Sequence, residues 1–145
     1  MGKVIKVFFV LVLIALIGIQ FIDVEKTNPP VTADIKASSE VKSILRNACY
    51  DCHSNETKWP WYSKIAPISF LIINHVEEGR EHLNFSDWEK YKNPKQDVLK
   101  EEIWNEINND KMPLKMYTYL HQKSNLDPLK RKAIKEWATK KKPWE

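Results

Sequence analysis

The chain opens with a long and almost unbroken apolar stretch. Between residues 7 and 22 only Gln20 is polar, and acidic residues follow at once. The run is slightly short for a membrane span unless the apolar pair at 4–5 is counted, yet it is longer than the apolar part of a usual signal peptide. No small-residue cleavage site follows it. We therefore expect residues 1–24 to be an uncleaved signal anchor, a transmembrane helix.

Positive charge on the short N-terminal flank predicts the orientation of this anchor. Lys3 and Lys6 precede the apolar run, and positive flanks stay on the cytoplasmic side. The sequence thus predicts a single-pass protein of the bacterial inner membrane. Its N-terminus would be cytoplasmic and the rest of the chain would lie in the periplasm.

Beyond residue 40 the apolar positions recur at helical spacing. Val41, Ile44, Leu45 and Ala48 predict an amphipathic helix that runs directly into Cys49. Further helices are indicated by Ile68, Leu71, Ile72 and Val76 after Pro67 and ending near Gly79, by the capping-box pattern Ser86-Asp87-Trp88-Glu89, by Leu99, Ile103 and Ile107, and by Leu129, Ala133 and Trp137 after Asp127-Pro128. No stretch alternates with period two. The predicted fold is all-α, with one small helical domain at residues 40–142.

The composition changes between the anchor and this domain. Residues 25–39 contain few large apolar side chains, and Pro29 and Pro30 favour an extended backbone. We expect this stretch to be a tether that holds the domain away from the bilayer.

Both cysteines of the chain fall in the stretch Cys49-Tyr50-Asp51-Cys52-His53. C-x-x-C-H is the attachment pattern for c-type haem, in which both thiols bond to the macrocycle and the histidine binds the iron. On a helical turn Cys49, Cys52 and His53 reach the same side, while residues 50 and 51 point elsewhere and are expected to be free to vary.

Together with the predicted helices, this motif gives the plan of a small cytochrome c-like helical domain around one haem. Three other interpretations of the motif are open. A thioredoxin-like redox pair needs a βαβ surround that the pattern does not predict, and a zinc site needs a second pair of ligands. The third is that two cysteines fell together by chance. Export favours haem, because covalent attachment takes place outside the cytoplasmic membrane.

Charge and motifs restrict the other functions. The formal net charge is +4, and the surplus gathers in a lysine-rich end between Lys130 and Lys142. Such a face could meet nucleic acid, anionic lipid or an acidic redox partner, although a solvated helix face is the simpler interpretation and an exported domain argues against nucleic acid. Gly79 is the only glycine of the domain, so no glycine-rich phosphate loop is present, and there is no H-E-x-x-H motif.

Several side chains could complete the coordination of a haem iron. Met112 is favoured because Pro113 restricts a loop that follows a predicted helix end, and a thioether ligand suits electron transfer. Met116, His121, His75, His82 and an open position are the alternatives. The bulky segment Trp59-Pro60-Trp61-Tyr62 is expected to cover the macrocycle edge or to pack in the core.

A set of longer stretches supports a family resemblance. They are Cys49 to Thr57, Trp59-Pro60-Trp61-Tyr62-Ser63, Ile65-Ala66-Pro67, Gly79-Arg80, Leu83-Asn84-Phe85-Ser86, Met112-Pro113, Tyr117, His121 and Trp137. With these stretches in order, the chain resembles, from about Val41 to Trp137, the bacterial haem-binding domain family of small, usually membrane-anchored monohaem c-type proteins.

The resemblance implies one covalently bound haem c on Cys49 and Cys52, with His53 as an iron ligand. It favours Met112 over Met116, since only Met112 matches the Met-Pro of the family. Two departures affect this loop region: Leu114 and Gln122 stand where the family often has proline.

Together these features favour an electron carrier that is not an enzyme and that exchanges electrons with redox proteins in or at the membrane. The contrasting hypothesis is a haem enzyme or sensor in which peroxide or a diatomic gas reaches an open or displaceable iron position. A third hypothesis is an adaptor domain whose two cysteines form a disulfide.

Overall fold

The structure is a computed structural model that describes residues 2–140, and it is helical, with no strand in that range. This confirms the all-α prediction. The elements are α1 (Gly2–Gly18), η1 (Ile19–Phe21), α2 (Ser39–Ala48), α3 (Tyr50–His53), η2 (Trp61–Lys64), α4 (Ile68–His82), η3 (Phe85–Lys90), α5 (Asn93–Asn108), α6 (Lys115–Leu120), η4 (Gln122–Ser124) and α7 (Pro128–Thr139), where η marks a 3-10 helix.

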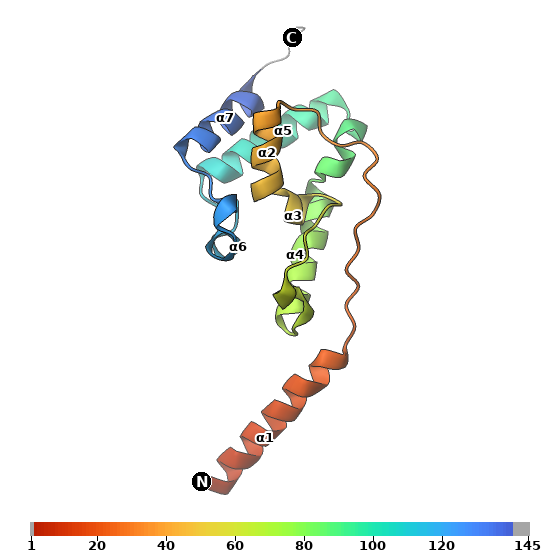
Figure 1. Ribbon diagram of the computed structural model, residues 1–145, viewed down its shortest axis with the longest axis vertical. Helices are drawn as coiled ribbons and strands as arrows, with labels where there is room; N and C mark the ends of the chain where they lie inside the picture. The colour runs from red at the N-terminus through yellow and green to blue at the C-terminus, as the bar shows by residue number, and fades with distance from the viewer. Residues whose placement is uncertain (1, 141–145) are drawn as a thin grey trace.

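The N-terminal helix projects away from the rest of the chain (Figure 1). Gly2–Phe21 has a mean hydropathy of 2.7 and none of its most apolar stretch is buried. Its 20 residues span about 30 Å as a helix, which is the thickness of a bilayer core. By length and composition this helix is able to cross a membrane.

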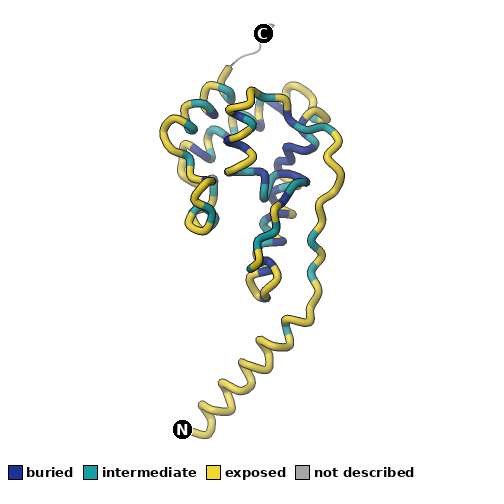
Figure 2. The backbone as a smooth tube through the Cα atoms, in the orientation of Figure 1, coloured by how far each residue is buried: buried dark blue, intermediate teal, exposed yellow. Residues whose placement is uncertain are grey.

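The core of the domain lies where α2, α5 and α7 meet, and these helices form the upper part of Figure 1. Because α2 packs against α7, the first and last helices of the domain are in contact. Figure 2 shows the buried backbone gathered in this region and along one side of α4. The core residues are Ile35, Val41, Ile44, Leu45, Tyr50, Leu83, Phe85, Trp88, Leu99, Ile103, Ile107 and Ile134.

The buried face of α4 differs from the predicted one. Ile68 and Leu71 are about half exposed, whereas Ser69 and Gly79 are buried together with Val76. Small residues let α4 approach its neighbours closely, and a search for large apolar side chains does not detect them. The helix also continues past Gly79 to His82.

Two other predicted helix details are wrong. The short helix after residue 84 is capped by Asn84, whose Oδ1 accepts from the Ser86 N–H, because the buried Ser86 hydroxyl accepts instead from the N–H of Asn55. In α7 Leu129 is 79% exposed, since it lies in the first turn beyond the core, and Ile134 takes the buried position.

The stretch expected to be a free tether lies on the domain for most of its length. Ile35 is 1% exposed, its N–H donates to the Phe85 carbonyl, and the Ala33 N–H donates to the carbonyl of Ser86. Farther upstream the Thr27 carbonyl accepts from Arg80. Backbone pairing and one large apolar side chain therefore fix a segment that its polar composition suggested would be loose.

Candidate functional site

The C-x-x-C-H motif forms a single helical turn directly after α2. Cys49 joins the two helices: its N–H donates to the Leu45 carbonyl, and its own carbonyl accepts from the N–H of His53 at 2.9 Å. The entering helix that the sequence predicted is thus confirmed, and it ends at Ala48.

The two residues between the cysteines point away from them but are not free to vary. Tyr50 is buried and stacks on Phe85 with ring centroids 5.3 Å apart, and its hydroxyl donates to Asp34. Asp51 accepts a hydrogen bond of 2.7 Å from the Tyr117 hydroxyl. The motif is therefore held from both sides by contacts that the spacing alone did not reveal.

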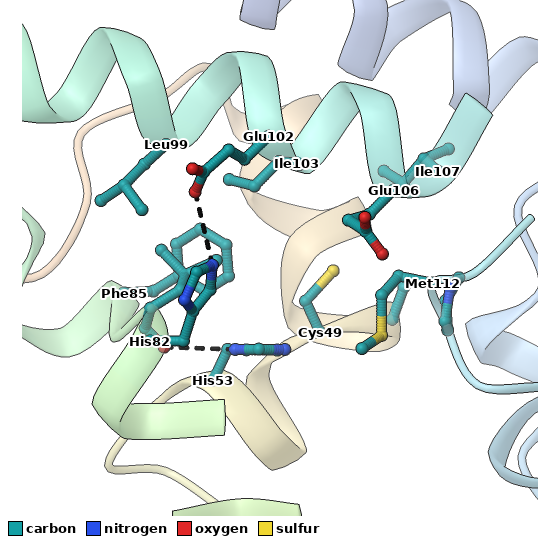
Figure 3. A pocket seen from close by; sticks show the side chains of 13 residues that line it. Cys49, His53, His82, Phe85, Leu99, Glu102, Ile103, Glu106, Ile107 and Met112 are labelled. Atoms are coloured by element: carbon teal, nitrogen blue, oxygen red, sulfur yellow. Dashed lines mark hydrogen bonds and ion pairs between the residues drawn. The ribbon is translucent and has the colours of Figure 1, made fainter. Parts of the chain in front are cut away.

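A mostly apolar pocket lies between this turn, α5 and the loop after α5 (Figure 3). Its lining residues are Ala48, Cys49, His53, His82, Leu83, Phe85, Leu99, Glu102, Ile103, Glu106, Ile107, Met112 and Pro113. Carboxylates come only from Glu102 and Glu106, one turn apart on α5. The pocket suits a flat apolar ligand that has polar groups at its rim.

His53 is oriented by backbone carbonyls. Its Nδ1 lies 2.9 Å from the Gly79 carbonyl and 3.2 Å from that of Leu83, so Nδ1 carries the proton. Burial lowers the pKa of His53 and keeps the ring neutral at pH 7. Nε2 is then left with a free lone pair, and Nδ1–H bonded to a carbonyl is the usual arrangement of a metal-binding histidine.

Met112 lies across the pocket from His53. In Figure 3 the ring edge of His53 that is not hydrogen-bonded points toward the Met112 sulfur, with Cys49 beside the space between them. The Met112 side of the pocket is held by two backbone bonds to the Glu106 carbonyl, from the N–H groups of Lys111 and Met112.

The other candidates for an iron ligand are placed differently. Met116 is 72% exposed, and neither it nor His75 nor His121 lines the pocket. His82 does line it, but its Nε2 is 3.3 Å from a Glu102 carboxylate oxygen. Met112 is therefore the sulfur or nitrogen donor best placed opposite His53.

His121 belongs to a separate cluster of aromatic side chains. Its ring stacks on Tyr117 with centroids 4.4 Å apart, and its Nε2 lies 2.7 Å from the hydroxyl of Tyr62. Through Tyr117 this cluster reaches Asp51 of the motif. Trp61, which was expected to be covered, is 74% exposed and lines no part of the pocket.

The thiols are poorly suited to redox exchange. Burial raises the pKa of Cys49 to about 12, and burial with the nearby Asp51 carboxylate raises the pKa of Cys52 to about 11. A thioredoxin-like pair needs a lowered thiol pKa, because the thiolate is the nucleophile. Cys49 lines the pocket, whereas Cys52 lies on the neighbouring side of α3, toward α4.

Two residues of α4 hold the motif in place, and the sequence pattern did not assign them a role. A Cβ at Gly79 would lie 2.6 Å from the Cys52 carbonyl oxygen, so only glycine fits there. Arg80 donates to the Ser54 carbonyl and to the Thr57 hydroxyl, just after the motif. The family resemblance did include Gly79-Arg80, and it was the only signal for them.

The donor set fits a metal held within an organic ring. Among residues 2–140 no three His, Cys, Asp or Glu side chains come together as a site for a bare ion. Apart from His82, which pairs with Glu102, and from Glu106, the polar and sulfur-bearing groups of the pocket are the His53 imidazole, the Met112 thioether and the Cys49 thiol, among apolar walls. These groups suit a haem, which supplies the remaining iron ligands itself.

Comparison with known proteins agrees with this chemistry. A family model described as "Haem-binding domain" matches residues 14–140, nearly the whole chain. No curated protein and no solved structure matches the chain.

Proposed function

Because this chain belongs to the haem-binding domain family, we propose that it is a membrane-tethered monohaem c-type electron carrier. The proposal assigns one haem to each chain, bonded to Cys49 and Cys52. His53 and Met112 would bind the iron. The observation that carries it is the free Nε2 edge of His53, which faces Met112 across an apolar pocket that Cys49 also lines.

When bound, the haem would supply an iron that gains and loses one electron. The residues of the chain would orient and shield it. The carbonyls of Gly79 and Leu83 fix the His53 ring, and Leu99, Ile103 and Ile107 of α5 exclude water from one wall. A fixed imidazole and a thioether change little between oxidation states, which favours electron transfer.

An electron carrier is favoured over an enzyme or a gas sensor for a geometric reason. The Met112 side chain lies opposite His53 and is 36% exposed, and its loop is fixed to the end of α5 by backbone hydrogen bonds. We therefore propose redox proteins in or at the membrane as partners. α1 would be the anchor in the bacterial inner membrane, with the haem domain on the periplasmic side.

Covalent haem is tested on the full chain produced with haem-attachment machinery. We expect the haem to stay with the polypeptide under denaturing electrophoresis, and the pyridine haemochrome spectrum to be that of a macrocycle with both vinyl groups saturated. A Cys49→Ala, Cys52→Ala double variant should carry no haem after denaturation. A spectrum with unsaturated vinyl groups in the unaltered chain would rule out attachment through both thiols.

The distal ligand is tested by a matched pair of methionine variants. Met112→Ala should lose the methionine-to-iron charge-transfer band, lower the reduction potential and bind carbon monoxide quickly in the ferrous state. Met116→Ala, four residues on and exposed, should leave all three unchanged. Rapid carbon monoxide binding by the unaltered protein would instead support the enzyme or sensor hypothesis.

A further inference from the structure

The end of the domain nearest to α1 carries a group of exposed apolar side chains. Trp61 is 74% exposed, Ile65 42%, Ile68 46% and Leu71 48%. They come from η2, the turn after it and the first turn of α4, and we call these four residues the apolar tip. None of them lines the pocket, and the core of the domain does not include them.

A specific contact places the apolar tip beside the end of the apolar helix. The Gln20 side chain donates to the Ala66 carbonyl at 2.9 Å and accepts from the Ala66 N–H at 3.1 Å. Ala66 lies within the tip, between Ile65 and Ile68. The carboxamide of Gln20 thus pairs with both backbone groups of one residue, and it joins the last turn of the anchor to the domain across 46 residues of sequence.

The anchor end presents apolar groups next to the same place. Phe21 is 84% exposed and Ile22 is 56% exposed. Figure 1 shows the tip, at the start of α4, on the side of the domain that faces α1. Exposed apolar groups from two distant parts of the sequence are therefore brought to one level, at the outer end of a helix able to cross a bilayer.

We propose that the apolar tip inserts into the interfacial layer of the membrane that α1 crosses. This inference rests on the proposed anchoring of α1. The composition of the tip suits the interface, because tryptophan prefers the headgroup level and Lys64, exposed beside the tip, can reach lipid phosphates. The domain would then rest on the membrane at two points, α1 and the tip, and would keep one face toward the lipid.

The immersion of the tip is tested by spin labelling of the full chain in vesicles of phosphatidylcholine and phosphatidylglycerol. Single cysteines are introduced by Ile65→Cys and Ile68→Cys in the tip. Leu129→Cys and Val98→Cys, exposed positions on α7 and α5, are the controls outside it, and Leu11→Cys in α1 reports on the anchor. Electron paramagnetic resonance power saturation compares the accessibility of each label to oxygen with its accessibility to a water-soluble nickel chelate.

The expected result is an oxygen-to-nickel accessibility ratio several-fold higher at residues 65 and 68 than at residues 98 and 129. A ratio at the tip equal to that of the controls would overturn the inference. Shielding from both reagents would also overturn it, since it would indicate a protein contact, such as a second copy of the chain. A low ratio at residue 11 would overturn anchoring, and the tip inference with it.

The same experiment separates this inference from the proposed haem attachment. Mass spectrometry of the labelled unaltered chain should show one haem and no spin label, because both native thiols are bonded. Uptake of label by Cys49 or Cys52 would count against covalent haem. In that case the tip labels are read in the Cys49→Ala, Cys52→Ala background, where a low ratio at residues 65 and 68 would still overturn the inference.

Discussion

At the scale of single residues, Gly79 holds the C-x-x-C-H turn in place because it has no side chain. Its missing side chain lets α4 touch the Cys52 backbone, and its carbonyl is then close enough to accept from His53. One glycine thus serves both the packing of α3 and the orientation of the proposed iron ligand. An alanine at this position is compatible with the helix, but its Cβ would clash with the Cys52 carbonyl oxygen.

We expect Gly79→Ala to destabilise the domain by about 1 to 3 kcal/mol, the usual range for overpacking. The sign of the change in the free energy of unfolding shows whether the position is crowded, because glycine to alanine in an exposed helix stabilises it by about 0.5 to 1 kcal/mol. Urea unfolding of the full chain in detergent measures it. Gly18→Ala, which has open space around it, is the control and should leave the unfolding midpoint of the domain unchanged.

Asp34 makes the stability of the domain depend on pH. Burial would raise its pKa, but hydrogen bonds from Lys42 and Tyr50 outweigh burial and lower the pKa below the usual value. A lowered pKa stabilises the fold above the unfolded-state pKa of about 3.9, and that stability is lost as the pH falls through the folded-state value.

The variant Asp34→Asn should therefore be less stable than the unaltered chain by about 1 to 2 kcal/mol at pH 7. The difference should be smaller at about pH 3, below the unfolded-state pKa, because this stability is lost progressively between the unfolded-state and the lower folded-state pKa. Urea unfolding at the two pH values measures both. An equal difference at both would mean that shape, and not charge, makes Asp34 useful.

Sequence reasoning found residues whose chemistry is rare and missed those whose role is geometric. Met112 was singled out because sulfur ligands are few and a proline follows it; it lines the pocket with His53, and its role as an iron ligand stays a prediction. Because of its size, Trp61 was expected to cover the macrocycle edge or to pack in the core, yet its side chain is exposed. Burial depends on neighbours in space, which are not visible in a short stretch of sequence. Gly79 acts only through a helix that lies far from Cys52 in the sequence.

At the scale of elements, Arg80 ties three segments together. From α4 it donates to the Ser54 carbonyl after the motif, to the Thr57 hydroxyl and to the Thr27 carbonyl in the extended segment before α2. Its bonds to Ser54 and Thr57 are partly buried, which limits competition from water, whereas the bond to Thr27 is exposed. Arg80 thus connects the extended segment to the domain.

Removal of this side chain should loosen the segment. We expect Arg80→Ala to lower the free energy of unfolding by about 2 to 4 kcal/mol, because several carbonyls lose a charged donor. Trypsin should also cut faster after Lys26. Arg46→Ala, which breaks a more exposed pair with Glu56, should change stability by at most about 1 kcal/mol and leave the cleavage rate unchanged. Equal effects of the two variants would contradict the proposed role of Arg80.

Element prediction was accurate where amphipathic spacing was strong. The helix before Cys49 and the helix through Ile103 were found because their large apolar residues face one core. The predicted buried face of α4 was wrong, since small residues make the closest contacts of this helix. The contacts of the predicted tether with the domain were not predicted, because backbone hydrogen bonds leave no trace in composition.

At the scale of the whole molecule, every described part that fixes the pocket is on the domain side of Gln20. The pocket joins groups from α3, α5 and the loop around Met112, far apart in sequence, so their convergence depends on the packing of α2 against α7. Local spacing singled out Cys49, His53 and Met112, which all line the pocket, but it did not predict how they are arranged in space. Long-range contacts decide which donors meet, and for that reason His121, one of the alternatives to Met112, lies elsewhere.

Helix α4 starts at the contact with the anchor and ends at the carbonyls that orient His53. Its 15 residues correspond to about 22 Å at 1.5 Å per residue. The helix is therefore a rigid spacer that sets the distance between the pocket and the C-terminal end of α1. Inserting two full turns would raise the pocket by about 11 Å and keep Gly79 toward Cys52, whereas inserting two residues would rotate that glycine away. Lengthening α4 is thus a way to vary the height of the pocket while its interior stays the same.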